Sequence, residues 1–277
     1  MSINNNTEEL IRSFSQEYES NDALQKYSTE TAGYGVNYLL EHEYARIYLE
    51  AIRRHLKVAP RRPLRIMEFG CGAGMNLIRL VALLGREQIQ IDSAYGTDFS
   101  AALVNRAGQE ASAYLSKEQR ARVTFHMARN ERLADDLITS TGAPDVVGSF
   151  DLIIGVNTFR YCHRLNAENE CAKDIRRLLR PGGVCVMIDM NDRFPLFRSR
   201  LQAAPDDPNE AFLPSLQQYS SPFAKAGFEM LTTTNFCWIP HSAGAALTLL
   251  CRALSPFLNM TVRRFAMRSL VVARRPA

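Results

Sequence analysis

An acidic residue and three glycines at alternating positions form the pattern with the clearest chemical meaning in this sequence. Glu68 is followed by Gly70, Gly72 and Gly74 within the segment IMEFGCGAGMN, residues 66–76. The run before them is short and apolar, as in a buried parallel strand, and a helical pattern follows. Glycine lets the chain bend sharply and lets a ligand touch the backbone. A carboxylate at the strand end favours a ligand whose nearby groups are cationic.

The nicotinamide-dinucleotide fingerprint G-x-G-x-x-G is the main competing pattern. Counted from Gly70, it needs a third glycine at the position where Met75 stands. That glycine allows the helix to approach the strand closely, and the seat of the pyrophosphate depends on this approach. The carboxylate of Glu68 would also repel a pyrophosphate. The spacing therefore disfavours a nicotinamide oxidoreductase.

A second acid, Asp98, ends the next strand pattern, which enters at Tyr95. At this place in a Rossmann-like sheet a carboxylate binds the two adjacent hydroxyls of a ribose. The alternative is that Asp98 only caps the following helix, but Ser100 is available for that role. We therefore expect Asp98 to bind a ribose.

Together these motifs resemble the class I S-adenosylmethionine (SAM) methyltransferases, whose motif I is acid-x-G-x-G-x-G. SFDLIIGVN (149–157) resembles their fourth-strand motif, and LLRPGGVCVMID (178–189) resembles their turn into strand five. GFEML and SLVVARRP resemble their closing strands. The resemblance spans about residues 60–240 and the last ten residues. It is nearest to the broad group that includes the ubiquinone/menaquinone methyltransferases.

The resemblance implies SAM as the cofactor, with its methionine part at the glycine motif and its ribose at Asp98. After strand three many relatives carry an Asp-Ala pair whose acid reads the adenine amino group. This chain has HMARNERLADD there, so Asn130, Glu131 or a backbone group would have to serve. The cofactor-binding residues expected on this basis are Glu68, Gly70, Cys71, Gly72, Gly74, Asp98, Phe99, Asn130 and Asn157.

Strand and helix patterns alternate along the chain, which predicts a parallel sheet with right-handed crossovers. The expected fold is α/β and Rossmann-like, with seven mostly parallel strands, an antiparallel last strand and helices on both faces. Residues 1–59 are expected to form a helical N-terminal cap, because apolar residues recur at helical spacing over 36–57. Residues 60–277 are expected to form the methyltransferase domain, with a helical insertion at 241–267.

Composition excludes several classes of protein. The 277 residues, 46% of them hydrophobic, suffice for one large α/β domain, and a net charge of +4 is low for a nucleic-acid-binding chain. The six cysteines form no C-x-x-C pair, so we expect no metal site and a reducing compartment. The N-terminus has no apolar signal core, and Arg252 and Pro256 interrupt the most apolar run. We expect a cytoplasmic protein.

The segment TFRYCHR, residues 158–164, follows strand four, where an acceptor should meet the methyl group. His163 is one candidate general base, since the ordinary pKa of histidine lies near working pH. Tyr161 would orient a hydroxyl group. His241, at the start of the insertion, is the other candidate histidine. The alternative for these residues is simple packing against the next helix.

The same region bears on the acceptor. Nucleic-acid amino-methyltransferases usually show N/D-P-P-Y/F after strand four, where this chain reads NTFRYCHR, and the chain has no Pro-Cys pair of the cytosine-C5 type. These absences point to a small molecule or a lipid rather than a nucleic acid. Arg160 would hold an anionic group of that acceptor. Asp189 and Asp192 face the mouth of the cleft by topology.

The insertion at 241–267 is unusual in its charge. From Met230 to Ala277 there is no Asp or Glu, yet there are six arginines, and 243–260 is apolar around most of a helix. We expect a lid over the substrate cleft with its apolar face inward. A dimer face is a second interpretation, and contact with an anionic membrane or a lipid-like substrate is a third.

The sequence as a whole predicts a SAM-dependent methyltransferase acting on a small, hydrophobic or amphipathic metabolite. One alternative is another reaction on the same scaffold, such as a cyclisation in which SAM is structural. A second alternative is a non-catalytic module that binds SAM or a partner protein. Release of S-adenosylhomocysteine separates the three.

Overall fold

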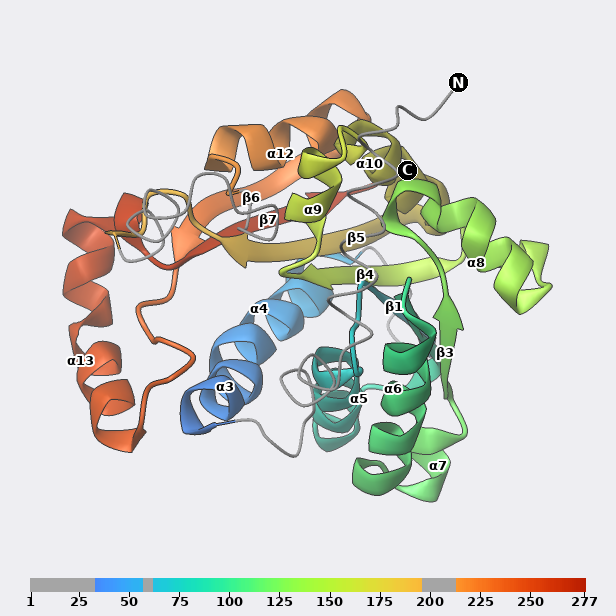
Figure 1. The fold of residues 1–277 in the computed structure, drawn as a ribbon, viewed down its shortest axis with the longest axis horizontal. Helices are drawn as coiled ribbons and strands as arrows, with labels where there is room; N and C mark the ends of the chain where they lie inside the picture. Colours follow the sequence, from blue (N-terminus) through green and yellow to red (C-terminus); the bar gives the residue numbers. More distant parts are fainter. Residues whose placement is uncertain (1–32, 57–61, 196–212) are drawn as a thin grey trace.

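A seven-stranded sheet forms the centre of the protein (Figure 1). The computed structural model describes residues 33–56, 62–195 and 213–277, so much of the expected cap lies outside the described residues. The strand order is β3-β2-β1-β4-β5-β7-β6, and β7 runs antiparallel to both of its neighbours while the other adjacent pairs are parallel. The strands are β1 (Leu64–Phe69), β2 (Ile91–Asp98), β3 (Val123–Met127), β4 (Phe150–Val156), β5 (Leu179–Met190), β6 (Glu229–Phe236) and β7 (Arg268–Arg274). The expected Rossmann-like α/β fold is confirmed.

Helices cover both faces of this sheet (Figure 1). Before β1 a helical run consists of α3 (Tyr34–Tyr38), η2 (Leu39–Tyr44), α4 (Ala45–Glu50) and η3 (Ala51–His55). The helices between β1 and β5 are α5 (Met75–Arg86), α6 (Ala101–Tyr114), α7 (Lys117–Arg120), η4 (Asn130–Arg132), α8 (Leu133–Thr141), η5 (Pro144–Val146), α9 (Phe159–Arg164) and α10 (Glu168–Leu178). After β5 come α12 (Leu216–Lys225), α13 (Ala245–Thr261) and η6 (Arg263–Phe265).

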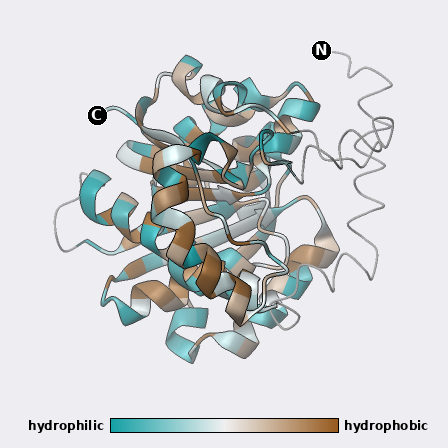
Figure 2. Ribbon diagram, turned by 90° about the vertical axis from the view of Figure 1, so that its left-hand side faces the viewer, coloured by the Kyte–Doolittle hydropathy of each residue, from teal (hydrophilic) through white to brown (hydrophobic). Residues whose placement is uncertain are grey.

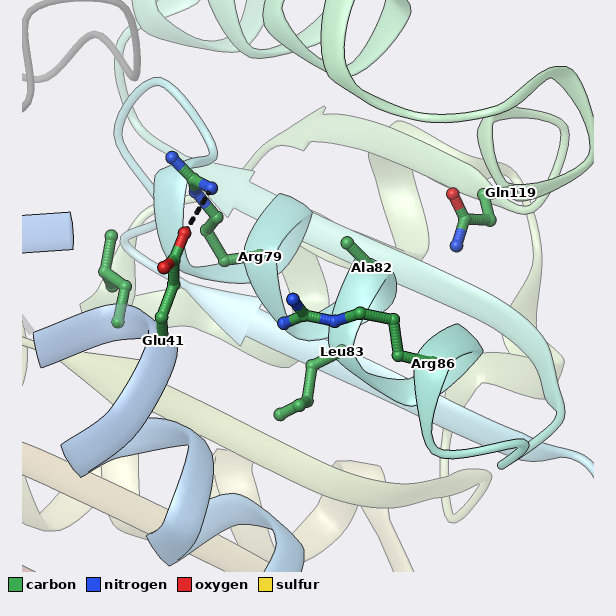
Figure 3. Close-up of a pocket in the computed structure, with 7 residues that line it drawn as sticks. Glu41, Arg79, Ala82, Leu83, Arg86 and Gln119 are labelled. Carbon is green, nitrogen blue, oxygen red and sulfur yellow. Dashed lines mark hydrogen bonds and ion pairs between the residues drawn. The ribbon is translucent and has the colours of Figure 1, made fainter. Parts of the chain in front are cut away.

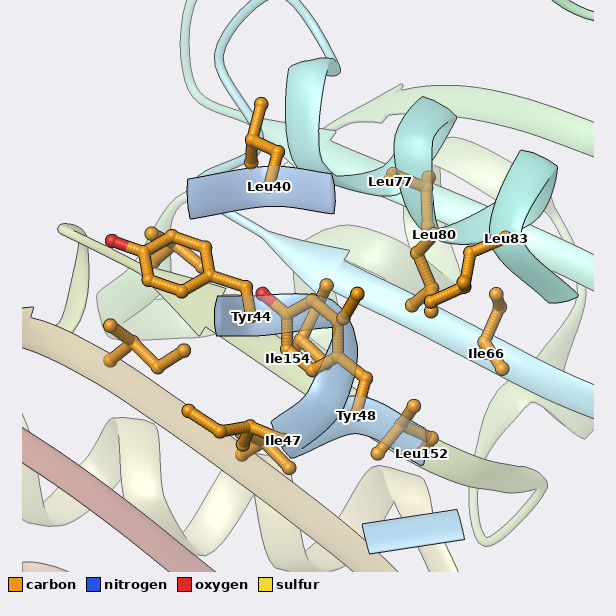
Figure 4. Close-up of a cluster of buried hydrophobic side chains, with 14 of the residues drawn as sticks. Leu40, Tyr44, Ile47, Tyr48, Ile66, Leu77, Leu80, Leu83, Leu152 and Ile154 are labelled. Atoms are coloured by element: carbon orange, nitrogen blue, oxygen red, sulfur yellow. The ribbon is translucent and has the colours of Figure 1, made fainter. Parts of the chain in front are cut away.

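The helical run before β1 belongs to the core of the domain. Tyr44, Ile47 and Tyr48 pack with apolar residues of α5 and with strand residues such as Ile66 and Ile154 in one buried cluster (Figure 4). These side chains recur at helical spacing, which places them on one face of the run. The separation of a 1–59 cap from a 60–277 domain stays a prediction, but the described part of this segment packs in the core of the sheet. It forms a layer on one face of the sheet.

A second cluster fills the other face of the sheet. It joins alternate residues of the same strands, such as Met67, Phe69 and Ile153, to apolar residues of α8, α10 and α12. Strand residues that alternate between two buried clusters explain why the strands read as continuous apolar runs in the sequence. The two clusters fix the strand ends, where the glycines and acids of the sequence motif lie.

Strand β5 begins earlier than the sequence suggests. The expected turn RPGG lies within the strand, because Leu179 already pairs with Phe150 before the register shifts, and Val184 then pairs with Leu152. Sequence alone assigns Pro and Gly to a turn, but an irregularity in pairing accommodates them inside the strand. The position of the strand end, at Met190, is as expected.

The insertion does not close over the sheet as a lid with its apolar face inward. Helix α13 contacts α3 and η6, while Leu249 and Phe257 are 67% and 64% exposed. The insertion joins β6 and β7 at the edge of the sheet, and from there only one side of the helix reaches the rest of the described chain (Figure 1). Within the described ranges, no helix combines the length and the apolar character needed to cross a membrane.

Candidate functional site

The glycine loop, residues 69–74, joins β1 to α5 in a conformation that depends on glycine. Gly70, Gly72 and Gly74 all have positive φ, at 58°, 54° and 81°. A β-carbon built on Gly70 would lie 1.9 Å from Oγ1 of Thr158, which follows β4. Because an L-residue would be strained there and would also collide with Thr158, the loop can lie against the β4 end only with glycine at position 70.

Glu68 lies directly beneath the glycine loop and is fully buried. The N–H of Leu77, in the first turn of α5, donates to its Oε2 at 2.8 Å. Burial raises the pKa of Glu68 to about 8, and the negative charge of Asp98 adds to this rise, although the bond from Leu77 opposes it. Glu68 therefore anchors the start of α5 beneath the loop.

Asp98 ties the end of β2 to the glycine loop. The N–H of Gly72 donates to its Oδ2 at 2.9 Å, and the N–H of Ser100 donates to its Oδ1 at 3.0 Å. Burial raises the pKa of Asp98, and the backbone bonds oppose the rise. The hydroxyl of Ser100 accepts from the N–H of Leu103 and caps α6, so Asp98 is not the cap of that helix. Its carboxylate retains lone pairs for the hydroxyls of a ligand.

Three other expected cofactor-binding residues, Cys71, Phe99 and Asn130, lie in or beside the same loop. Asn157 belongs to a second group of residues, described below. Nδ2 of Asn130 donates to Oγ1 of Thr158 at 2.8 Å, and Thr158 lies against Gly70. The N–H of Cys71 donates to the carbonyl of Thr97 at 2.8 Å, which fastens the loop to β2. Phe99 follows Asp98 and is half-buried. Thr158 was not singled out from the sequence, although it stands in the segment after strand four.

A second group of polar residues gathers at the ends of β4, β5 and β7, and we call it the arginine cluster: Asn157, Arg160, Asp189, His241 and Arg268. Arg268, Asp189 and Arg160 are buried, whereas Asn157 is half-buried and His241 is exposed. The two guanidinium groups carry one more unit of charge than the single carboxylate balances. The buried residues of the cluster thus hold the two more accessible ones, Asn157 and His241, in place.

Arg268 holds both accessible residues of the arginine cluster. Its Nη2 contacts Nε2 of His241, and its Nη1 donates to Oδ1 of Asn157 at 3.3 Å. A guanidinium only donates hydrogen bonds, so Nε2 of His241 accepts and the ring proton sits on Nδ1. Asn157 likewise turns its Nδ2 hydrogens away from Arg268. Its positive φ of 55° is one that asparagine tolerates.

This geometry disfavours His241 as a general base. Loss of hydration at the ring and the positive charge of Arg268 lower the pKa of His241. The basic nitrogen faces a permanent cation, so His241 presents an N–H donor instead.

Asp189 and Arg160 form the buried base of the cluster. The backbone N–H of Arg160 donates to Oδ2 of Asp189 at 3.2 Å, and Nε of Arg160 lies 3.7 Å from Oδ1. Burial raises the pKa of Asp189, while Arg160 and Arg268 oppose the rise. Nη2 of Arg160 donates to the hydroxyl of Tyr161 at 2.9 Å and its guanidinium lies over the same ring. Tyr161 is therefore joined to the cluster, as a catalytic candidate should be.

His163 lies in an aromatic group between α9 and α12. Its ring packs edge-on against Phe159, at 5.3 Å between centroids, and stacks with Tyr219 of α12 at 6.3 Å. Burial lowers the pKa of His163, and Glu168 opposes this. His163 follows Arg160 by three residues on α9, and its ring lies between α9 and α12, against Phe159 and Tyr219. The packing alternative describes its surroundings better than the general-base prediction.

A groove of about 260 Å³ lies on the outer side of α5 (Figure 3). Leu40, Leu83 and Arg79 line it together with Gln119 of α7, and Arg79 is paired with Glu41 at 2.8 Å. Parallel sheets bind ligands beyond the carboxyl ends of their strands. The groove lies between helices, so we do not assign it to the site.

Two contributors to the site carry no local motif. Arg268 stands in the last strand, far along the chain from Asn157, and no spacing rule connects them. Tyr44, in η2, is buried near Arg268 and Asp189, and burial raises its pKa to about 12. The one available signal was the concentration of arginines without acids near the C-terminus.

Comparison with known proteins agrees with this fold. A family model described as a methyltransferase domain matches residues 61–233. The non-reducing polyketide synthase tazA of Aspergillus terreus is 31% identical over 133 residues, which cover 48% of this chain and 4% of that protein. The chain thus spans only a small part of the curated relatives that it matches.

Solved structures share the fold at low sequence identity. The citrinin polyketide synthase CMeT domain has a TM-score of 0.60 at 16% identity and covers 94% of this chain and 58% of that chain. The CurJ carbon methyltransferase has a TM-score of 0.57 at 16% identity, covering 92% and 58%. The [4+2]-cyclase SpnF has a TM-score of 0.54 at 17% identity, covering 84% and 82%. At these identities the likeness shows the fold alone.

Proposed function

Since the chain belongs to the class I SAM-dependent methyltransferases, we propose that it transfers the methyl group of SAM to a carbon atom of a small, hydrophobic or amphipathic metabolite. The family makes it an enzyme with SAM as its cofactor. The acceptor and the type of acceptor atom are the proposed part. The observation that carries the proposal is the pair of donors that Arg268 holds at the edge of the sheet.

The residues of the glycine loop fit SAM. Two carboxyl groups, Glu68 and Asp98, lie below and beside it, and the loop leaves no room for a side chain at Gly70. Oε1 of Glu68 has no hydrogen-bond partner in the described chain. A cationic ligand above the loop would favour ionisation of this carboxyl. When bound, SAM supplies an activated methyl group, and Asp98 is placed to accept hydrogen bonds from its ribose.

The arginine cluster suits an acceptor that develops negative charge on oxygen. Asn157 and His241 both turn their accepting atoms to Arg268, so they present N–H donors to a ligand. Donors held in advance stabilise an oxyanion as it forms. For methyl transfer to a carbon beside a carbonyl group, that carbon first loses a proton to solvent water, which gives an enolate whose charge lies on oxygen. The enolate carbon then takes the methyl group as the bond from sulfur to the methyl breaks, and S-adenosylhomocysteine leaves. The charge of the buried guanidinium adds to this stabilisation.

Two of the similar proteins favour a carbon acceptor. The CurJ protein is described as a carbon methyltransferase, and the curated relative tazA is a polyketide synthase. Polyketide intermediates carry carbon atoms between two carbonyl groups, which lose a proton readily. We therefore propose compounds with such a carbon and an apolar body as acceptors.

The alternative is a cyclisation on the same scaffold, which the fold of the SpnF cyclase favours. Donors that polarise a carbonyl group would also assist ring closure. In that case the cofactor would hold the fold and would not be consumed. The alternative predicts product formation without release of S-adenosylhomocysteine.

The test offers the protein SAM with a labelled methyl group and a panel of 1,3-dicarbonyl compounds with apolar chains. We expect release of S-adenosylhomocysteine and label on the carbon between the two carbonyl groups, located by NMR. Label found only on oxygen or nitrogen would contradict the carbon assignment. An isomerised product with no release would support the cyclase, and SAM binding without any product would support a binding module.

A variant separates the acceptor role of Asn157 from a cofactor role. Asn157→Asp keeps the tolerated backbone conformation but replaces the donating amide by an accepting oxygen. We expect turnover to fall by about tenfold or more, since a lost oxyanion donor costs on the order of 100-fold. SAM affinity, measured by calorimetry, should stay within about twofold. A loss of SAM affinity instead would place Asn157 at the cofactor.

A further inference from the structure

Helix α13 carries its apolar residues on the outside. The side that faces the protein holds Thr248, Cys251, Ser255 and Asn259, which are buried or half-buried. These positions recur at intervals of three or four residues, so they lie along one side of the helix. The exposed large apolar residues of the helix are Leu247, Leu249, Leu250, Leu254, Phe257 and Met260. This arrangement is the reverse of an ordinary surface helix.

Polar contacts hold the helix in this orientation. Nε1 of Trp238 donates to Oδ1 of Asn259 at 2.9 Å, which fixes its C-terminal half. The loop before the helix packs tightly on α3, because a β-carbon on Gly35 would lie 2.5 Å from the carbonyl oxygen of Pro240. The outward face is therefore a defined surface of the protein, and Figure 2 looks onto the side of the molecule that carries it.

The charge on the segment that carries this face has one sign. Arg252, Arg263 and Arg264 are exposed on or just after α13, and none of them forms an ion pair with another described residue. Residues 230–277 contain no Asp or Glu. An exposed apolar face of six large side chains marks an interaction site, and the arginines at its border favour an anionic partner.

We propose that α13 docks on the surface of a membrane containing anionic lipids, with its apolar face among the acyl chains and its arginines at the headgroups. Interfacial helices have this composition, with Leu and Phe on one face and cations beside it. A surface position also agrees with the length of the helix, which does not span. The proposal does not rest on the acceptor proposed above.

A second copy of the chain fits this face less well. In a two-fold symmetric dimer the same patch meets itself. The arginines of one copy would then lie beside those of the other, with no acid from residues 230–277 to separate them. A lipid surface supplies both the apolar layer and the negative charge.

The test is flotation of the full chain with vesicles of phosphatidylcholine alone or mixed equally with phosphatidylglycerol. We expect binding to the mixed vesicles, at least tenfold weaker binding to phosphatidylcholine, and release by 0.5 M NaCl. Replacement of Leu250 and Phe257 by Gln should lower binding by about tenfold or more. Arg252→Gln and Arg263→Gln should each lower binding by about fivefold, since each basic residue near the surface contributes comparably.

The matched control replaces two exposed apolar residues on other elements, Tyr114 and Met127, by Gln. It should bind vesicles like the unmodified protein. Unchanged melting temperatures would show that each variant folds. Equal binding by the Leu250/Phe257 variant would overturn the proposal. A second result would also overturn it: no vesicle binding by the unmodified protein, together with a mass of two chains in light scattering that falls to one chain in the Leu250/Phe257 variant. The face would then belong to a dimer.

Discussion

The glycine loop and the arginine cluster lie at the same edge of one sheet but bury ionisable groups of opposite type. Beneath the loop are the buried carboxyl groups of Glu68 and Asp98, while the cluster holds Arg160 and Arg268 around the single carboxylate of Asp189. A cationic cofactor favours the first environment, and an acceptor that develops negative charge favours the second. We propose that the site is divided into an electrophile side at the loop and a nucleophile side at the cluster.

The two regions also differ in how they are held. The loop is fixed by backbone conformation and by bonds from backbone N–H groups, such as those of Gly72 and Leu77. The cluster is fixed by side chains that hold other side chains, as Arg268 holds His241. Mutation should therefore act on cofactor affinity in the first region and on turnover in the second.

The largest effect is expected from Gly70→Ala in the glycine loop. The new β-carbon would collide with Thr158 and the backbone would be strained, so the loop must move. We expect SAM affinity, measured by calorimetry, to fall by about 100-fold or more. Gly108→Ala, where a β-carbon meets nothing within 4 Å, is the control and should leave affinity unchanged. Wild-type affinity in Gly70→Ala would remove the loop from the cofactor site.

Arg268→Gln should change the cluster and spare the loop. Loss of hydration at the ring still holds the pKa of His241 below its ordinary value of about 6.5, but without the guanidinium this pKa should rise part of the way toward it, because the adjacent positive charge is gone. NMR titration of the ring measures this shift. Turnover should fall by about tenfold or more while SAM affinity stays within about twofold. An unchanged His241 pKa would show that the contact with Arg268 does not control the ring.

Glu68→Gln tests the negative side of the comparison through pH. The folded pKa of about 8 lies above the ordinary 4.5, so the folded chain keeps a proton that the unfolded chain loses. Stability of the wild type should thus fall as pH rises from about 4.5 to 8. The variant should lack this part of the slope and be the more stable at pH 9, by on the order of a few kcal/mol. Parallel pH profiles in urea unfolding would contradict the shifted pKa.

The smallest effect is expected from His163→Phe. Its ring contacts are aromatic, with Phe159 and Tyr219, and a phenyl ring can preserve them. We expect SAM affinity and turnover within about twofold of the wild type and a melting temperature within a few degrees. A loss of turnover above tenfold in a folded variant would restore His163 as a general base.

The sequence by itself determined the fold and the glycine loop. The alternation of strand and helix patterns predicted the parallel sheet. The acid and its three glycines lie within a few consecutive residues, so local backbone rules are enough to interpret them. Asp98 was found for the same reason, because its place at a strand end is a local property. The apolar spacing over 36–57 predicted a helix, but only the packing of Tyr48 showed that this helix belongs to the core.

Only the tertiary structure decided the arginine cluster and the orientation of α13. Arg268 and Asn157 meet because β7 lies beside β5 and β5 beside β4, and no local pattern encodes that neighbourhood. His163 and Arg160 stand three residues apart on α9, and only the tertiary structure shows that Arg160 bonds to Asp189 while the ring of His163 packs against Phe159 and Tyr219. The composition of α13 was visible in the sequence, but a helix apolar on most sides packs where its few polar contacts hold it. Trp238 and Asn259 supply such a contact, and it leaves the leucines facing outward.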